Sequence, residues 1–240
     1  MKKTAGEQSG AAVDARGARS EATRAKLVAI AERLFAERGI EGVSLNDINR
    51  EAGQRNKNAT HYHFGSKQGL LQAILDKHEP GIAARQTALV AALETQGAVN
   101  LRSLVRAMVR PLADKLTDPE GGRFYLRFMA QLVVAHTLAA LRLRESALRV
   151  NRFDRLQALL RALIPDLPET VAQQRGILVA VLMMQSLAEL ARMLDGDDGN
   201  QPVADPELFV ANLEDCLSAI LAAAPGEETA ALGRAKRRRI

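Results

Sequence analysis

Apolar residues recur at intervals of three and four positions along most of this chain, a spacing that is typical of amphipathic helices. Residues 1–19 come before this pattern and carry almost nothing to bury, so we expect them to be disordered. No strand-like alternation and no internal repeat occurs, and the pattern therefore predicts an all-α protein. The first helix face consists of Leu27, Ile30, Ala31, Leu34 and Phe35.

Capping and turn residues divide residues 20–80 into short helices. Ser44 is expected to cap the second helix, with Asp47 three positions later as its capping-box partner. Gly53 ends that helix after about two turns. A Pro-Gly pair at 80–81 interrupts a later helix and marks either a kink or the end of the first domain.

Residues 81–224 are expected to form a larger helical domain. Pro111 should bend its second helix, and Asp205 followed by Pro206 is a favourable start for its last helix. The final residues, 225–240, end in GRAKRRRI and are expected to form a basic disordered tail. The helices of this domain are expected near 82–95, 101–116, 120–138, 140–163, 168–194 and 206–223.

Composition supports a helical protein of the cytoplasm. Hydrophobic residues make up 47% of the chain and aromatic residues only 3%, so the core must consist of Leu, Ala, Val and Ile. The single cysteine, Cys216, fits a reducing compartment. No secretory signal is recognisable, and the longest strictly apolar run, 177–184, is too short to span a membrane. We therefore expect a cytoplasmic protein with no membrane partner.

The net charge of +5 is distributed unevenly along the chain. Residues 1–80 carry thirteen basic and ten acidic side chains, and the last seven residues add five basic ones. The segment between them is acidic, with fifteen basic and eighteen acidic side chains. Basic ends can indicate a polyanionic partner, although an exposed basic tail often serves only solubility.

A polar segment, AGQRNKNATHYHFGSK at 52–67, lies between two apolar-periodic segments. Its position after a short helix and a glycine turn predicts a helix-turn-helix unit whose last helix enters the major groove of DNA. Ala59 and Phe64 can pack against the protein. Asn and Arg side chains match base edges, while Lys and Tyr suit phosphates. The side chains expected to face double-stranded DNA are Arg55, Asn56, Lys57, Asn58, His61 and Tyr62.

TRAKLVAIAERLFAERGIEGVSLNDINREAG, followed by YHFGSKQGLLQAIL, resembles the amino-terminal DNA-binding domain of the TetR family of bacterial regulators. The resemblance covers about residues 23–77. It implies a two-domain, all-helical homodimer whose second domain binds small molecules and dimerises through its last two long helices. It also implies phosphate contacts from Thr23, Arg24, Ser44 and Lys67.

The chain departs from the family pattern at two places in this unit. Ten residues separate the AG pair at 52–53 from Phe64, where the family usually has nine. It therefore remains open which of four residues contacts a base: Arg55, Asn56, Lys57 or Asn58. Asn49 occupies a position that usually holds a small Ala, so it must pack differently or point outward.

Two sets of residues in the larger domain are candidates for dimerisation and for effector binding. The last two helices carry broad apolar stripes that could pair with their two-fold mates, or could lie within the core of one chain. The candidate interface residues are Val181, Met184, Phe209, Leu213, Cys216, Leu217 and Ile220. The candidate effector pocket, whose members could equally be plain core, contains Met108, Phe124, Phe128, Met129, Leu132, His136 and Met183.

Signatures of catalysis are missing from the sequence. It contains no H-E-x-x-H, no phosphate-binding glycine loop and no G-x-S-x-G, so we expect neither an enzyme nor a bound cofactor or metal. Two functions remain open. One is a homodimeric repressor released from a palindromic operator by a small molecule, and the other is an effector-independent architectural protein with the same DNA-binding unit.

Overall fold

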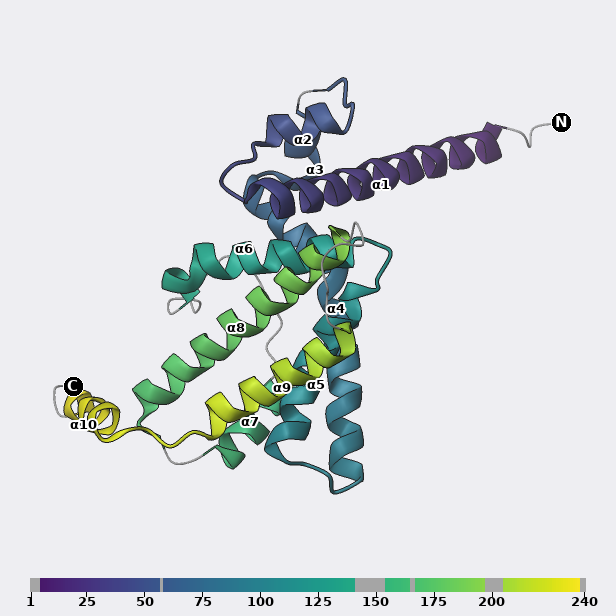
Figure 1. Ribbon diagram of the computed structural model, residues 1–240. Helices are drawn as coiled ribbons and strands as arrows, with labels where there is room; N and C mark the ends of the chain where they lie inside the picture. The colour runs from purple at the N-terminus through teal and green to yellow at the C-terminus, as the bar shows by residue number, and fades with distance from the viewer. Residues whose placement is uncertain (1–4, 57, 141–153, 165–166, 197–204, 238–240) are drawn as a thin grey trace.

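The computed structural model describes residues 5–56, 58–140, 154–164, 167–196 and 205–237. These residues form α-helices joined by short turns, with one 3-10 helix and no strand among them, so the all-α prediction is confirmed. Figure 1 shows their arrangement. The helices are α1 (Ala5–Arg38), α2 (Leu45–Glu51), α3 (Ala59–Phe64), α4 (Lys67–Thr95), α5 (Leu101–Ala113), η1 (Asp114–Leu116), α6 (Gly122–Ala140), α7 (Asp154–Leu163), α8 (Glu169–Asp195), α9 (Pro206–Ala222) and α10 (Glu227–Arg237).

Both ends of the chain differ from the sequence prediction. Helix α1 begins at Ala5, within the segment expected to be disordered, and its first half projects beyond the rest of the molecule (Figure 1). Helix α10 likewise occupies most of the predicted C-terminal tail. Ala and Arg are frequent in both segments and both favour helix, even where there is little to bury.

Helix α4 is longer than predicted. It continues from Lys67 to Thr95 with Pro80 inside it, where the sequence suggested an interruption. A proline removes one backbone hydrogen bond from a helix. Burial on both sides compensates for that loss, because Leu75 before the proline and Ile82 after it are both part of the core. The predicted helix at 82–95 is therefore the second half of α4.

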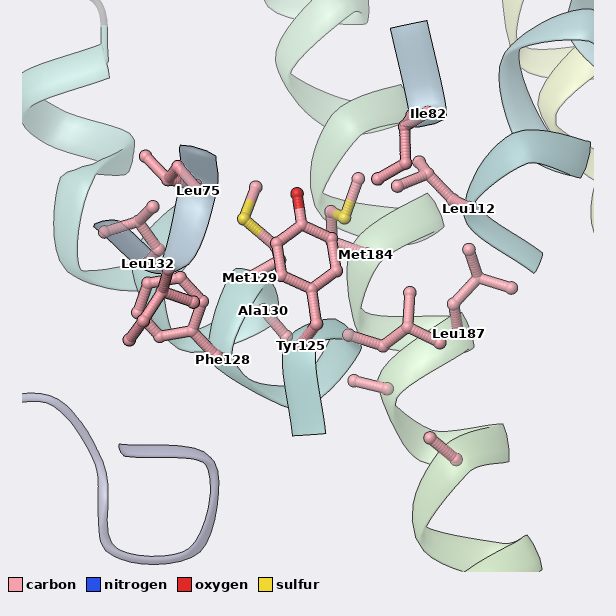
Figure 2. Packing of buried hydrophobic residues seen from close by; sticks show 14 of the residues in the cluster. Leu75, Ile82, Leu112, Tyr125, Phe128, Met129, Ala130, Leu132, Met184 and Leu187 are labelled. Atoms are coloured by element: carbon pink, nitrogen blue, oxygen red, sulfur yellow. The ribbon is translucent and has the colours of Figure 1, made fainter. Parts of the chain in front are cut away.

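The core lies where α6 packs against both α1 and α8. Tyr125 and Phe128 of α6 are fully buried. In Figure 2 the side chains of Met129 and Met184 lie to either side of the Tyr125 ring. Burial raises the pKa of the Tyr125 phenol far above its usual value, so this side chain is neutral in the core.

Helices α8 and α9 lie side by side in Figure 1 and pack against each other. Arg110 of α5 holds α9 in place through hydrogen-bonded ion pairs with Glu207 and with the buried Glu214. By length and composition α8 could cross a membrane, with a mean hydropathy of 1.7 over its most apolar window. Only 39% of that window is buried within the chain, so α8 leaves apolar surface uncovered.

Candidate nucleic-acid interface

Helices α2 and α3 form a helix-turn-helix unit at one end of the molecule (Figure 1). The predicted capping box of α2 is present: the backbone N–H of Asp47 donates to the Ser44 hydroxyl at 3.2 Å, and that of Ser44 donates to Oδ2 of Asp47 at 3.0 Å. At the other end of α2, Nζ of Lys26 donates to the Ala52 carbonyl at 2.9 Å. Gly53 then turns the chain with φ of +63°.

The hydrogen bonds of Ser44 also fix the charge of its partner. The Ser44 hydroxyl and backbone, followed by Arg50, lower the pKa of the Asp47 carboxyl to about 2. Asp47 is therefore ionised at neutral pH and places a negative charge in the first turn of α2, where the helix dipole favours it.

A buried polar contact joins α2 to α3. Asn49 is only 3% exposed, and its Oδ1 accepts the backbone N–H of Thr60 at 3.0 Å and also the Thr60 hydroxyl. The sequence left open whether Asn49 packs or points outward, and in the structure it packs inward. No sequence signal identified its partner, because the pairing depends on the course of the turn between them.

Helix α3 begins at Ala59, so several predicted DNA-facing residues lie in the turn before it. Arg55, Asn56 and Asn58 are exposed there, and Oδ1 of Asn56 accepts the backbone N–H of Asn58 at 2.9 Å. Lys57 lies outside the described residues.

Within α3 two polar residues are exposed and one, Thr60, is buried beside Ala59. His61 and Tyr62 point to solvent, with Tyr62 79% exposed, while Ala59 and Thr60 are buried. Phe64 is partly buried against the core. The structure thus brings Asn58, His61 and Tyr62 onto one exposed surface.

The four predicted phosphate-contacting residues have different surroundings. Thr23 and Arg24 are half-buried in α1, and the guanidinium of Arg24 lies 5.3 Å from the centroid of the Phe64 ring. Ser44 is exposed. Lys67 is half-buried at the start of α4, and its ammonium lies 5.9 Å from the centroid of the Phe35 ring.

Behind this unit, α1 and α4 meet α6 and the loop before it through a group of residues that we name the junction cluster: Glu32, Lys77, His78, Asp118 and Tyr125. Asp118 belongs to it because its Oδ2 lies 4.0 Å from Nδ1 of His78. Glu32 is 1% exposed, and its carboxylate accepts Nζ of Lys77 at 2.7 Å and Nε2–H of His78 at 2.5 Å. The His78 ring also stacks on Tyr125, with 4.3 Å between the ring centroids.

The junction cluster also reaches the loop before α6. Nζ of Lys77 donates to the Glu120 carbonyl at 2.6 Å. Sequence reasoning missed this cluster. Its one signal was a charged residue, Glu32, on the apolar face of the first helix, four positions after Val28 and three before Phe35.

A groove of about 770 Å³ opens beside the junction cluster, between α1, α4 and the loop before α6. Phe124 is the one predicted effector-pocket residue that lines it. Its charged residues carry both signs, and several are already paired, such as Arg33 with Glu51 at 2.5 Å and Glu32 with Lys77. The lining therefore does not favour one class of ligand.

The remaining predicted effector-pocket residues do not line that groove. Phe128, Met129, Leu132 and Met183 are buried in the core, and Met108 is partly buried against it. The backbone of His136 belongs to α6, but its side chain lies outside the described residues. Among the described residues there is no group of three or more His, Cys, Asp or Glu that could hold a metal ion.

The predicted dimer residues divide between the core and the surface. Met184, Leu213 and Leu217 are buried within the chain itself, because α8 and α9 pack against each other and against α5 and α6. Cys216 is exposed, and three more are partly buried: Val181, Phe209 and Ile220.

The large apolar side chains that these two helices expose are different ones. Leu178 and Leu182 of α8 are 59% and 36% exposed, and Leu208 of α9 is 62% exposed. The first two are four residues apart and so share one helix face. The apolar stripe in the sequence could not distinguish these exposed leucines from the apolar residues that other helices of the same chain bury.

Two family models match the chain. One, described as bacterial regulatory proteins of the tetR family, matches residues 27–74, and the other, described as a tetracyclin repressor-like C-terminal domain, matches residues 106–219. Together the two matches span more than half of the chain.

The chain is also similar to individual proteins. The HTH-type transcriptional regulator TtgR and the probable HTH-type transcriptional regulator ArpR, both of Pseudomonas putida, are each 41% identical to it over 61 residues. Each match covers 25% of this chain and 29% of the length of the relative.

Among solved structures, the TetR family transcriptional regulator PfmR from Thermus thermophilus is 22% identical, with a TM-score of 0.41 over 83% of this chain and 100% of its own. The ketosteroid transcriptional regulator KstR2 of Mycobacterium tuberculosis is 20% identical, with a TM-score of 0.37 over 90% of this chain and 91% of its own.

Proposed function

The chain belongs to the TetR family of bacterial regulatory proteins and is a DNA-binding transcriptional regulator; on that premise we propose that it is a homodimeric repressor, released from a palindromic operator by a small-molecule effector. We further propose that residues 20–80 act as the DNA-binding domain and residues 81–224 as the effector-binding and dimerisation domain.

The observation that carries the DNA-binding part of this proposal is the exposed polar face of the α2–α3 unit. Asn58, His61 and Tyr62 extend from a short helix whose other side, formed by Ala59 and Thr60, is buried. Side chains of this kind can donate to and accept from base edges and phosphates. This side presents polar side chains together with the exposed Tyr62 ring, and such a surface suits the phosphates and base edges of the major groove.

Exposed leucines on α8 and α9 support the homodimer. Leu178, Leu182 and Leu208 leave apolar area in water that a second copy of the same helices would cover. Two-fold symmetry presents the same residues from both copies, giving a four-helix interface. The two α3 helices would then address half-sites roughly 34–36 Å apart, which corresponds to a palindromic operator.

Release by an effector requires that the ligand bind more tightly to a conformation in which the two α3 helices are wrongly spaced. The contacts that would transmit such a change are those of the junction cluster, where Glu32 and Lys77 connect α1 and α4 to the loop before α6. We propose that the effector binds among α5, α6 and α8. Phe128 and Met129 fill that region, so binding there requires them to move apart.

Selection from a random library of duplex DNA, combined with light scattering of the free and DNA-bound protein, tests the proposal. We expect an enriched sequence with two inverted half-sites and a complex that contains two protein chains per duplex. Enrichment of no sequence, or of a single half-site bound by one chain, would refute it.

An effector-independent architectural role is the second candidate. The observation that favours it is the dense packing of Phe128, Leu132 and Met183, which are buried in the core instead of lining an open cavity. Thermal-shift screening against a metabolite library separates the two functions. A compound that raises the melting temperature and weakens DNA binding supports the repressor, whereas a library without effect favours the architectural role.

A further inference from the structure

We propose that Asn49 is a positioning residue for DNA recognition: from α2 it holds the first turn of α3, and it thereby determines which side chains face the bases. The inference rests on the proposed function, in which α3 enters the major groove. Asn49 cannot contact DNA itself, because it is only 3% exposed.

Helix α3 needs support from outside because it has only six residues. Isolated helices of this length are not stable in water. The first backbone N–H groups of any helix also have no acceptors within the helix. An N-cap side chain usually provides one, by accepting the N–H of the second or third helical residue. Within the described residues, the N-cap of α3, Asn58, makes no side-chain hydrogen bond of this kind.

Asn49 supplies the missing cap from the neighbouring helix. Its Oδ1 accepts the backbone N–H of Thr60, the second residue of α3, at 3.0 Å, and accepts the Thr60 hydroxyl as well. The backbone carbonyl of Asn49 meanwhile accepts the N–H of Gln54 at 3.0 Å. A single residue of α2 therefore holds the turn at both ends, near its start and just after α3 begins.

This attachment sets the rotation of α3 about its own axis. With Thr60 turned toward α2, His61 and Tyr62 lie about 100° and 200° around the helix from that contact, because successive side chains are about 100° apart. Both are exposed. If α3 began at another residue, a different pair would face the groove, so Asn49 fixes the reading face without taking part in it.

The consequence for base contacts is specific. Asn58, His61 and Tyr62 are the residues that Asn49 places toward the bases. Arg55 and Asn56 approach from the turn, and Asn56 is already engaged through Oδ1 with the N–H of Asn58.

The experiment compares four full-length proteins by selection from a random duplex library: the wild type, Asn49→Ala, Thr60→Ser and Ile40→Val. Thr60→Ser keeps both donors and should enrich the wild-type sequence. Ile40→Val removes a methyl group from a buried site in the turn between α1 and α2 and controls for destabilisation alone. Amide hydrogen exchange at residue 60 gives a readout that does not depend on DNA.

We expect Asn49→Ala to discriminate between correct and incorrect base pairs at the positions read by α3 roughly tenfold less well than the wild type, which is about the effect of losing one side-chain contact to a base. The slope of log affinity against log salt should equal that of the wild type. The amide of residue 60 should exchange faster in Asn49→Ala and at the wild-type rate in Ile40→Val.

Wild-type discrimination in Asn49→Ala would overturn the inference. So would unchanged exchange at residue 60. If the wild type itself enriches no sequence, the proposed function fails, and faster exchange in Asn49→Ala would then show that the attachment holds α3 but serves no base readout.

Discussion

Removing the carboxylate of Glu32 should destabilise the protein far more than removing a glutamate from the surface of the same helix. Glu32 is buried between Lys77 and His78, at 2.7 Å and 2.5 Å from their nitrogens. Breaking a buried charged pair by deleting one partner costs about 3–5 kcal/mol. Lys77 is 27% exposed and can turn to water, so the unpaired N–H of His78 accounts for most of the loss.

The expected cost of Glu32→Ala is therefore about 3 kcal/mol, near the lower end of that range, since a buried donor without a partner costs about 1–3 kcal/mol and the lost side chain also leaves a void. In a protein of this size 1 kcal/mol lowers the melting temperature by roughly 2–4 °C, so the melting temperature should fall by about 6–12 °C.

The matched control is Glu37→Ala. Glu37 lies five residues later in α1 and pairs with Arg33 at 3.6 Å on the surface, a pair worth no more than about 0.5 kcal/mol. Both variants are compared by thermal and urea unfolding at one protein concentration, because the proposed dimer would make stability depend on concentration. If the two variants unfold within about 0.5 kcal/mol of each other, the buried junction cluster does not hold α1 to α4 as described.

Three further predictions concern the surface. Lys67→Ala should weaken binding to all DNA sequences and reduce the slope of log affinity against log salt by about one ion; an unchanged slope in a filter-binding titration would contradict the phosphate contact. Leu182→Glu in α8 should weaken dimerisation by roughly 10- to 100-fold, since burying one leucine contributes about 1.5–3 kcal/mol. The control Leu163→Glu in α7 should leave dimerisation unchanged, and sedimentation at several concentrations measures both variants. Asp47→Asn should lower the melting temperature at neutral pH. Ser44 lowers the folded-state pKa of Asp47 to about 2, so the ionised Asp47 carboxylate stabilises the fold above the unfolded pKa near 4, and this stabilisation disappears toward pH 2. The melting temperatures of the wild type and the variant should therefore converge near pH 2. A difference in melting temperature that does not depend on pH would exclude the ionised cap.

Local patterns predicted the positions of most helices, because the apolar period and the caps are properties of neighbouring residues. The capping box at Ser44 and the start of α9 at Pro206 are examples, and both are present in the structure. Helices α1 and α10 at the two ends of the chain, and helix α4, differ from those predictions. A local rule counts the hydrogen bond lost at Pro80, but not the packing of Leu75 and Ile82 that keeps the helix continuous.

The candidate sites were less predictable because they depend on contacts between distant residues. The polar face at His61 and Tyr62 follows from the sequence, but the hydrogen bonds from Asn49 to Thr60 depend on the turn that brings them together. An apolar stripe likewise shows that a helix face is covered, without showing by what. Leu217 is covered by its own chain and Leu178 is not, although both belong to apolar stripes.

The continuity of α4 has a mechanical consequence. Its 29 residues form a rod of roughly 43 Å, with one end beside the helix-turn-helix unit and the other beside α5. A tilt of the Thr95 end would carry the α2–α3 unit along as a rigid body, so the distance between the two DNA-reading helices of a dimer could change without any rearrangement inside them. Pro80, where the rod lacks one backbone hydrogen bond, is the point at which it bends most easily, so bending there would reduce the part of such a tilt that the α2–α3 unit receives.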